Sequence, residues 1–208
     1  QGRLMTGANP SKNRKWSAVK RLGGNSDGAA AIEFALLAIP FMMLVFATIE
    51  TFIAFTGEQL MANAVDTMAR KIRTGEVTFG LGKATDVTEV EFRQQFCEEI
   101  SILSMCSSTE ATTPSKLYLD VRQFATFADM PRDVPKVSTA EYSDLDTSEF
   151  AFSPGGPNTN NMVRAYYRWQ IITDLVRPFI TNIRVAGDAL PTDFLIVSTS
   201  AFQNEEYH

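Results

Sequence analysis

The chain has 208 residues, with 19 basic and 24 acidic side chains, two cysteines and one histidine, His208. This length leaves room for one membrane span and one domain of about 150 residues. The one histidine, His208, lies at the terminus, where it is expected to fray, which argues against histidine-based catalytic triads and most zinc sites. The carboxylate pairs Glu98–Glu99 and Glu205–Glu206 are typical of a solvated surface. We therefore expect no catalytic residue, no metal site, no cofactor and no enzymatic activity.

The first 28 residues form a basic leader. They carry six Lys or Arg side chains against one carboxylate, whereas residues 56–208 carry 13 basic and 21 acidic side chains. Because basic residues beside a membrane span stay on the cytoplasmic side, we expect a cytoplasmic N terminus and an outside domain at residues 56–208, which in a bacterium is periplasmic. A basic tail can also bind nucleic acid. This tail adjoins an apolar run and has one aromatic residue, Trp16, so we expect no nucleic-acid partner.

An apolar run follows the leader over residues 28–55, with the sequence GAAAIEFALLAIPFMMLVFATIETFIAF. About twenty helical residues cross a hydrocarbon core of roughly 30 Å. The run is too long for a secretory signal. A buried core helix would show a polar stripe, whereas residues 35–48 hold one polar side chain, Thr48. We therefore predict a single transmembrane helix over residues 29–55.

Glu33 lies near the start of this run, where a carboxylate is costly. An ionised group at the bilayer centre costs on the order of 2.5–3.5 kcal/mol, and less near the interface. One interpretation places Glu33 about one turn into the bilayer, with its side chain reaching the cytoplasmic headgroups. In the other, the chain is cut between Gly28 and Ala29, and the new α-amino group supplies a cation for Glu33, the fifth residue of the mature chain.

The helix is expected to continue outside the membrane as a stalk over residues 56–73. Apolar residues recur there every four positions, at Leu60, Ala64, Met68 and Ile72. Gly75 follows a basic last turn and is expected to end the helix.

A second helix is expected from Thr88, which can form a capping box with Glu91, to near Cys106. An unbroken helix would hold the Cα atoms of Cys97 and Cys106 about 13 Å apart, whereas a disulfide needs roughly 4.4–6.8 Å. In an oxidising compartment the two thiols can therefore pair only if the chain turns near residues 100–104. Otherwise they are two separately buried thiols.

Three segments alternate between apolar and polar residues as strands do, at residues 116–127, 162–172 and 194–202. The first is expected to be half-buried. Residues 128–161 collect Pro, acidic and small polar residues and are expected to form a long surface excursion, and residues 175–185 a short helix or irregular cover. This content predicts an α+β fold in which a long N-terminal transmembrane and stalk helix packs on a small antiparallel sheet, as in pilins.

The start of the apolar run resembles the type IV pilin signal, in which a prepilin peptidase cuts after a glycine on the cytoplasmic face and leaves Glu at the fifth mature position. Gly28, Ala29, Glu33 and Phe34 match this spacing. The longer stretch GAAAIEFALLAIPFMMLVFATIE resembles TadE-like minor pseudopilins of the tight-adherence (Tad/Flp) type IV pilus system. Further matches are Arg73-Thr74-Gly75, the Cys97 and Cys106 pair before LYLDV, Tyr167-Arg168-Trp169 and the closing AFQNE.

The resemblance implies a subunit of the bacterial inner membrane that is processed by a prepilin peptidase and acts with other Tad pilus subunits and assembly proteins to build an adhesive fibre. Gly28 and Ala29 would flank the cut, and Glu33, followed by Phe34, would pair with an α-amino group during assembly. The domain at residues 56–208 is too large for the major Flp pilin, which is almost entirely helix. The alternative is an unprocessed single-pass membrane protein whose periplasmic domain binds or senses a partner.

Overall fold

The computed structural model describes the backbone of residues 26–207 and the side chains of residues 30–207. Residues 1–25 of the predicted leader therefore lie outside the described residues. The chain divides into two units, residues 1–46 and 47–208. Helix α2 (Ser26–Arg73) has 48 residues and contributes to both units. This long N-terminal helix and the sheet of the second unit confirm the predicted α+β fold.

The C-terminal part of α2 forms one wall of the main core, as the spacing of its apolar residues predicts. Ala64, Met68 and Ile72 are buried, and Val65 and Ala69 widen the same face. Burying a side chain as large as that of Met or Ile stabilises a fold by roughly 1.5–3 kcal/mol. The stalk is thus an integral part of the second unit.

Two glycines determine how α2 meets its surroundings. A Cβ at Gly57 would lie 3.2 Å from the ring of Trp169, so the missing side chain lets the helix approach strand β3 (Asn160–Gln170) closely. Gly75 has φ +78°, a conformation that glycine adopts without strain, and it follows the end of α2 as predicted. A Cβ there would lie 2.6 Å from the ring of Tyr207, which packs over this turn.

Helix α3 (Glu89–Glu99) begins at the predicted capping box. The Thr88 side chain accepts a hydrogen bond from the Glu91 backbone amide, and the Glu91 carboxylate accepts one from the Thr88 amide. The helix ends at Glu99, earlier than the predicted end near Cys106, because the chain turns there into the 3-10 helix η1 (Ser101–Leu103).

The turn after α3 brings the two cysteines together. Ser104 closes η1 with φ 50°, and the Cα atoms of Cys97 and Cys106 lie 5.6 Å apart, joined by a disulfide. Both cysteines pack at the edge of the main core. The disulfide therefore ties the end of α3 to the segment that leads into the sheet.

The sheet has the strand order β2-β1-β3-β4, with β1 at Leu117–Phe124, β2 at Phe152–Ser153 and β4 at Asp193–Gln203. The pairs β1–β3 and β3–β4 are antiparallel, as predicted. The two-residue strand β2 pairs with β1 in parallel, so the complete sheet is mixed. A strand of two residues is too short to show an alternating pattern, which is why the sequence did not predict β2.

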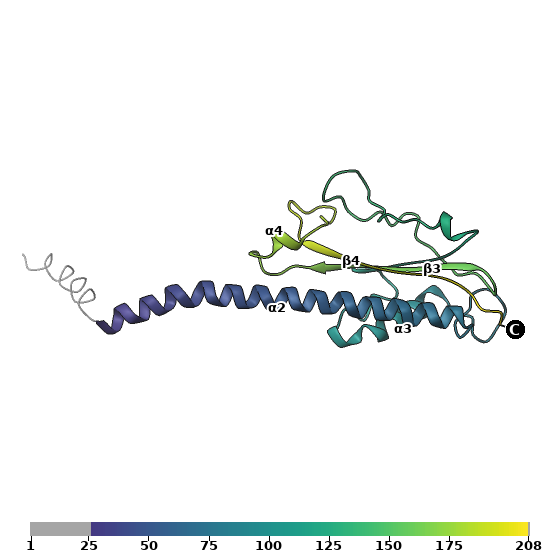
Figure 1. Ribbon diagram of the computed structural model, residues 1–208, viewed down its shortest axis with the longest axis horizontal. Coiled ribbons are helices and arrows are strands. Elements are labelled where there is room, and N and C mark those ends of the chain that lie inside the picture. The colour runs from purple at the N-terminus through teal and green to yellow at the C-terminus, as the bar shows by residue number, and fades with distance from the viewer. Residues whose placement is uncertain (1–25, 208) are drawn as a thin grey trace, which may run out of the picture. The chain divides into compact units, whose positions relative to one another are not determined.

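Both faces of the sheet are covered (Figure 1). On one face, α2 and α3 pack against apolar residues such as Leu117, Val121 and Val163. On the other face, Tyr166 forms a smaller core with Leu145, Ile183 and Leu195. This second layer comes from the connection between β1 and β3 and from the connection between β3 and β4, which contains the short helix α4 (Arg177–Ile180).

The long segment at residues 128–161 forms part of this second layer, and most of its residues are partly or fully exposed. The ring of Phe150 stacks on that of Tyr166 at 4.8 Å between centroids. The Arg164 guanidinium donates hydrogen bonds to the carbonyls of Pro131 and Asp133 at 2.6 and 3.2 Å. This layer partly covers the second face of the first strand, where Asp120 is buried while Tyr118 and Arg122 keep intermediate exposure.

A buried polar cluster joins α3 to the start of β1. The Arg93 guanidinium donates to the backbone carbonyls of Glu110, Ala111 and Leu117 at 2.7–3.2 Å. The Glu110 carboxylate is almost fully buried and accepts hydrogen bonds from the amides of Ser115 and Leu117, among others. Burial alone would raise the pKa of Glu110, but hydrogen bonds from Ser115, Leu117 and Lys116 outweigh burial and hold its pKa below the usual 4.5.

We predict that Glu110 makes the fold sensitive to acid. Because its pKa is lowered in the folded state, its contribution to stability is complete above pH 4.5 and is lost as the pH falls through the lowered value. Glu110→Gln should reduce the free energy of unfolding at neutral pH by about 1–3 kcal/mol and flatten its dependence on pH below 4.5. Urea unfolding of the full chain in detergent, followed by circular dichroism, measures both effects. Glu149→Gln, at an exposed carboxylate, is the control, and an unchanged acid dependence in Glu110→Gln would contradict the prediction.

Candidate membrane and assembly site

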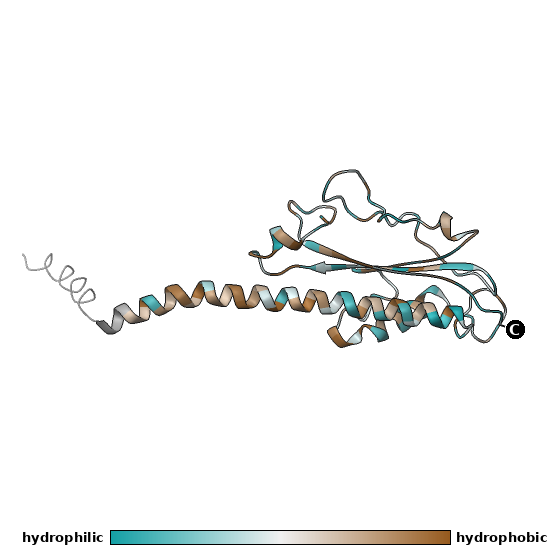
Figure 2. Ribbon diagram, in the orientation of Figure 1, coloured by the Kyte–Doolittle hydropathy of each residue, from teal (hydrophilic) through white to brown (hydrophobic). Residues whose placement is uncertain are grey.

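The N-terminal part of α2 exposes a continuous apolar surface. Large side chains from Ile32 to Phe55 are 37–75 % exposed. Figure 2 shows this part of the helix mostly in the hydrophobic colour, whereas its C-terminal part is mixed with hydrophilic residues. By length and composition the helix can cross a membrane, and its most apolar stretch has no buried residue. In water so large an apolar surface would be unfavourable, so it indicates a single-pass membrane anchor.

The predicted processing and pairing residues all lie on the first turns of α2. Gly28 and Ala29 belong to the helical backbone from its start at Ser26. Glu33 and Phe34 follow them, and both are exposed. The next basic residue along the chain after Glu33 is Arg70, so the helix itself supplies no nearby cation. The structure thus presents Glu33 on an apolar helix surface.

Glu50 has a role that the sequence pattern did not reveal. Its carboxylate accepts hydrogen bonds from the backbone amides of Ile172 and Thr173, the latter at 2.9 Å. These two amides follow the end of β3, so Ile172 and Glu50 are separated by 122 positions in the sequence. The sequence shows a carboxylate at the end of the apolar run, but no local pattern indicates which groups donate hydrogen bonds to it. Glu50 therefore joins α2 to the connection between β3 and β4.

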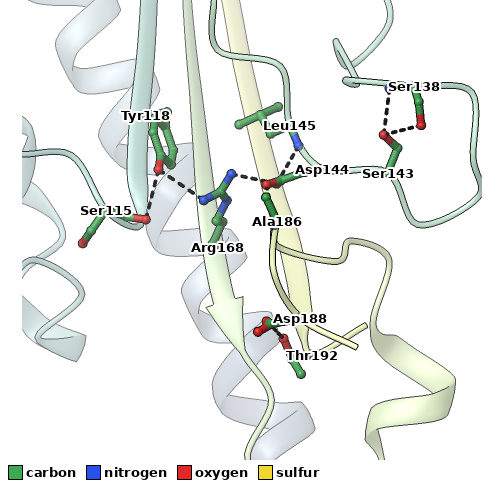
Figure 3. A network of polar contacts seen from close by, with 10 residues as sticks. All are labelled: Ser115, Tyr118, Ser138, Ser143, Asp144, Leu145, Arg168, Ala186, Asp188 and Thr192. Atoms are coloured by element: carbon green, nitrogen blue, oxygen red, sulfur yellow. Dashed lines mark hydrogen bonds and ion pairs between the residues drawn. The ribbon is translucent and has the colours of Figure 1, made fainter. Parts of the chain in front are cut away.

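A second set of polar contacts holds the other half of this connection (Figure 3). The Arg168 guanidinium of β3 donates to the Asp144 carboxylate at 2.7 Å. Asp144 also accepts hydrogen bonds from the backbone amides of Leu145 and Ala186, at 2.7 and 3.0 Å. Arg168 further lies over the ring of Tyr118 at 4.9 Å. One partly buried ion pair, together with the Asp144–Ala186 hydrogen bond, thus links β3 to both connections of the outer layer.

The remaining predicted site residues, Cys97 and Cys106, belong to the core edge near α3 and are not part of the apolar helix surface. Among residues 30–207, no group of three or more His, Cys, Asp or Glu side chains is arranged to hold a metal ion.

Within residues 26–207, these features define one apolar helix that is long enough to span a membrane and one compact α+β domain. Residues 28–70 match the family model described as TadE-like protein. The match confirms the predicted resemblance over α2, and it points to a protein associated with the Tad pilus. No curated protein and no solved structure matches the chain.

We predict that Glu50→Ala frees the start of the β3–β4 connection. Each hydrogen bond to a charged acceptor contributes about 1.5–3 kcal/mol, so amide exchange at Ile172 and Thr173 should accelerate roughly tenfold or more. Hydrogen exchange of the full chain in detergent, followed by mass spectrometry over residues 171–180, measures this change. Glu58→Ala on the same helix is the control and should leave this segment unchanged. Equal exchange in both variants would show that Glu50 does not hold the connection.

Proposed function

We propose that this chain is a minor pseudopilin that acts in the assembly of an adhesive Tad/Flp pilus. The observation that carries the proposal is the TadE-like match over residues 28–70, which begins at the glycine of the predicted processing site and runs through the apolar helix into the stalk. The exposed apolar surface of the same helix supports a membrane-inserted subunit. Residues 29–55 would span the inner membrane, residues 1–28 would lie in the cytoplasm, and residues 56–208 would lie in the periplasm.

In this proposal, a prepilin peptidase cuts between Gly28 and Ala29. The new α-amino group lies near the start of the helix, one turn from Glu33. An amine and a carboxylate that pair in the bilayer avoid the cost of two separate charges in a low dielectric. Glu33 would pair with the α-amino group of its own chain or of a neighbouring subunit, and the second pairing would favour docking of one apolar helix on another.

The domain of residues 56–208 would serve as the periplasmic head of the subunit. Its inner core, its disulfide and its covered outer face give a rigid body on a helical stalk. We infer that this head contacts other Tad pilus subunits and assembly proteins and that it is not an enzyme. A rigid head keeps its surface fixed relative to the stalk, which suits a subunit that must dock in one orientation.

The proposal is tested by the N-terminal residue of the protein isolated from native membranes, identified by intact mass and peptide mapping. We expect a mature chain that begins at Ala29. Gly28→Leu is the matched variant, and it should accumulate with its basic leader because the glycine before the cut is lost. A native protein that keeps the leader would contradict processing and would favour the unprocessed single-pass alternative.

We predict that Glu33→Gln leaves membrane insertion intact and weakens pilus assembly. Glutamine keeps the size of the side chain but removes the charge, and a lost pairing worth about 1.4 kcal/mol corresponds to a tenfold weaker association. The measurement compares pili sheared from cells with the amount of the subunit in the membrane fraction. Glu58→Gln, on the stalk part of α2, is the control. Normal pili in Glu33→Gln would argue against the pairing role.

A further inference from the structure

The connection between β3 and β4 exposes large apolar side chains although it belongs to a well-packed domain. Ile172 and Phe179 are both 83 % exposed, and Leu175 and Leu190 are 46 and 66 % exposed. Within this connection, part of the short helix α4 has the hydrophobic colour in Figure 2. Apolar residues that gather on one surface element mark a contact with a partner or with a membrane.

The exposure of these side chains is not a consequence of a detached loop. Glu50 accepts hydrogen bonds from the first two amides of the connection, and Asp144 accepts one from Ala186. Between these points Ile183 is buried in the outer core, and its backbone amide donates to the carbonyl of Asp193 at 3.3 Å. The backbone is therefore fixed at both ends and in the middle while the apolar side chains point outward.

The position of Glu50 gives the depth of this connection. About twenty helical residues cross a hydrocarbon core of roughly 30 Å, so if the proposed span of residues 29–55 enters the hydrocarbon at its first residue, it leaves near Thr48 and its last residues lie among the headgroups. Glu50 then lies at the outer boundary of the membrane, where a carboxylate is tolerated. Because Ile172 and Thr173 bind to Glu50, the connection begins at this same depth.

The apolar side chains also continue the surface of the helix. An apolar groove of about 310 Å³ lies between α2 and α4, and Phe55, Phe179 and Phe194 contribute aromatic rings to its lining. Arg184, on the same connection, is exposed and suits a lipid phosphate, since arginine places its charged end among headgroups. The groove thus joins an apolar helix surface to an apolar loop at the level of the membrane boundary.

We propose that residues 172–190 form a membrane-docking loop, which immerses Ile172, Leu175, Phe179 and Leu190 in the outer face of the bilayer that α2 spans. This inference rests on the proposed membrane anchoring. Docking fixes the tilt of the head against the membrane. When a subunit is extracted into a fibre, both these side chains and the span leave the lipid. The loop is therefore a second, separate contact that holds an unassembled subunit at the membrane.

The test places a tryptophan at single positions of the full chain and reconstitutes each variant in vesicles of phosphatidylethanolamine and phosphatidylglycerol with lipids brominated near the top of their acyl chains. Phe179→Trp reports on the loop, and Phe41→Trp reports on the span. Phe127→Trp is the matched control, since Phe127 is 52 % exposed and follows the end of β1 that pairs with Asn160, at the opposite end of β3 from Ile172. The fluorescence of the unsubstituted chain, from Trp16 and Trp169, is subtracted.

We expect quenching of about twofold or more for Phe179→Trp, because an interfacial segment places its apolar side chains about 5–10 Å into the headgroup and acyl boundary. Phe41→Trp should also be quenched, and Phe127→Trp should not. If Phe41→Trp is quenched while Phe179→Trp behaves as Phe127→Trp does, the docking loop is wrong and the anchor stands. If Phe179→Trp is unquenched and its emission shifts with protein density, a second copy covers the loop and the proposal is overturned. If Phe41→Trp is unquenched, the membrane anchor itself fails, and the docking loop fails with it.

Discussion

Helix α2 must satisfy two different environments with one unbroken backbone, and the rest of the structure depends on this constraint. Residues 34–47 are apolar on all sides, which suits lipid, because a span has no polar solvent to face. Residues 56–73 are apolar on one face, which suits a domain whose core lies on one side of the helix. The change in periodicity along one helix therefore divides the chain into an anchor and a head without a linker.

A helix that serves both as anchor and as part of the head must be packed firmly against the head, and the sheet supplies the surface for this packing. Gly57 lets α2 approach the ring of Trp169, and the buried side chains of the stalk pack against α3 and the sheet. The outer layer then covers the opposite face of β3, and the ion pair between Arg168 and Asp144 connects β3 to that layer beside its small apolar core. Removing one partner of a partly buried ion pair leaves an unpaired charge and destabilises the fold. The pair therefore specifies the arrangement of the layer more than it adds to net stability.

Local patterns predicted the parts of this fold that local physics determines. The four-residue spacing after residue 56 predicted the buried face of α2, the Thr88 and Glu91 pair predicted the start of α3, and alternation predicted three strands. The contacts that the sequence did not reveal join distant segments. Glu50 meets Ile172 across 122 residues, and Arg164 meets Pro131 across 33, and neither pair leaves a periodic trace. The layer at residues 128–161 was missed for a related reason, since its backbone is held mainly by single side chains rather than by a repeating element.

The two carboxylates that flank the apolar run differ in how they are satisfied. Glu50 receives two backbone amides from its own domain, so its charge is stabilised before any partner arrives. Among residues 30–207, no side chain or amide donates a hydrogen bond to Glu33, which lies exposed on an apolar surface. A charge in this position is costly in lipid unless a cation or water reaches it. In the proposed function, a cation for Glu33 would come from the N terminus of this chain, from a neighbouring chain or from the membrane surface. Processing after Gly28 would place an α-amino group one turn from Glu33 and would turn a costly carboxylate into a contact for assembly.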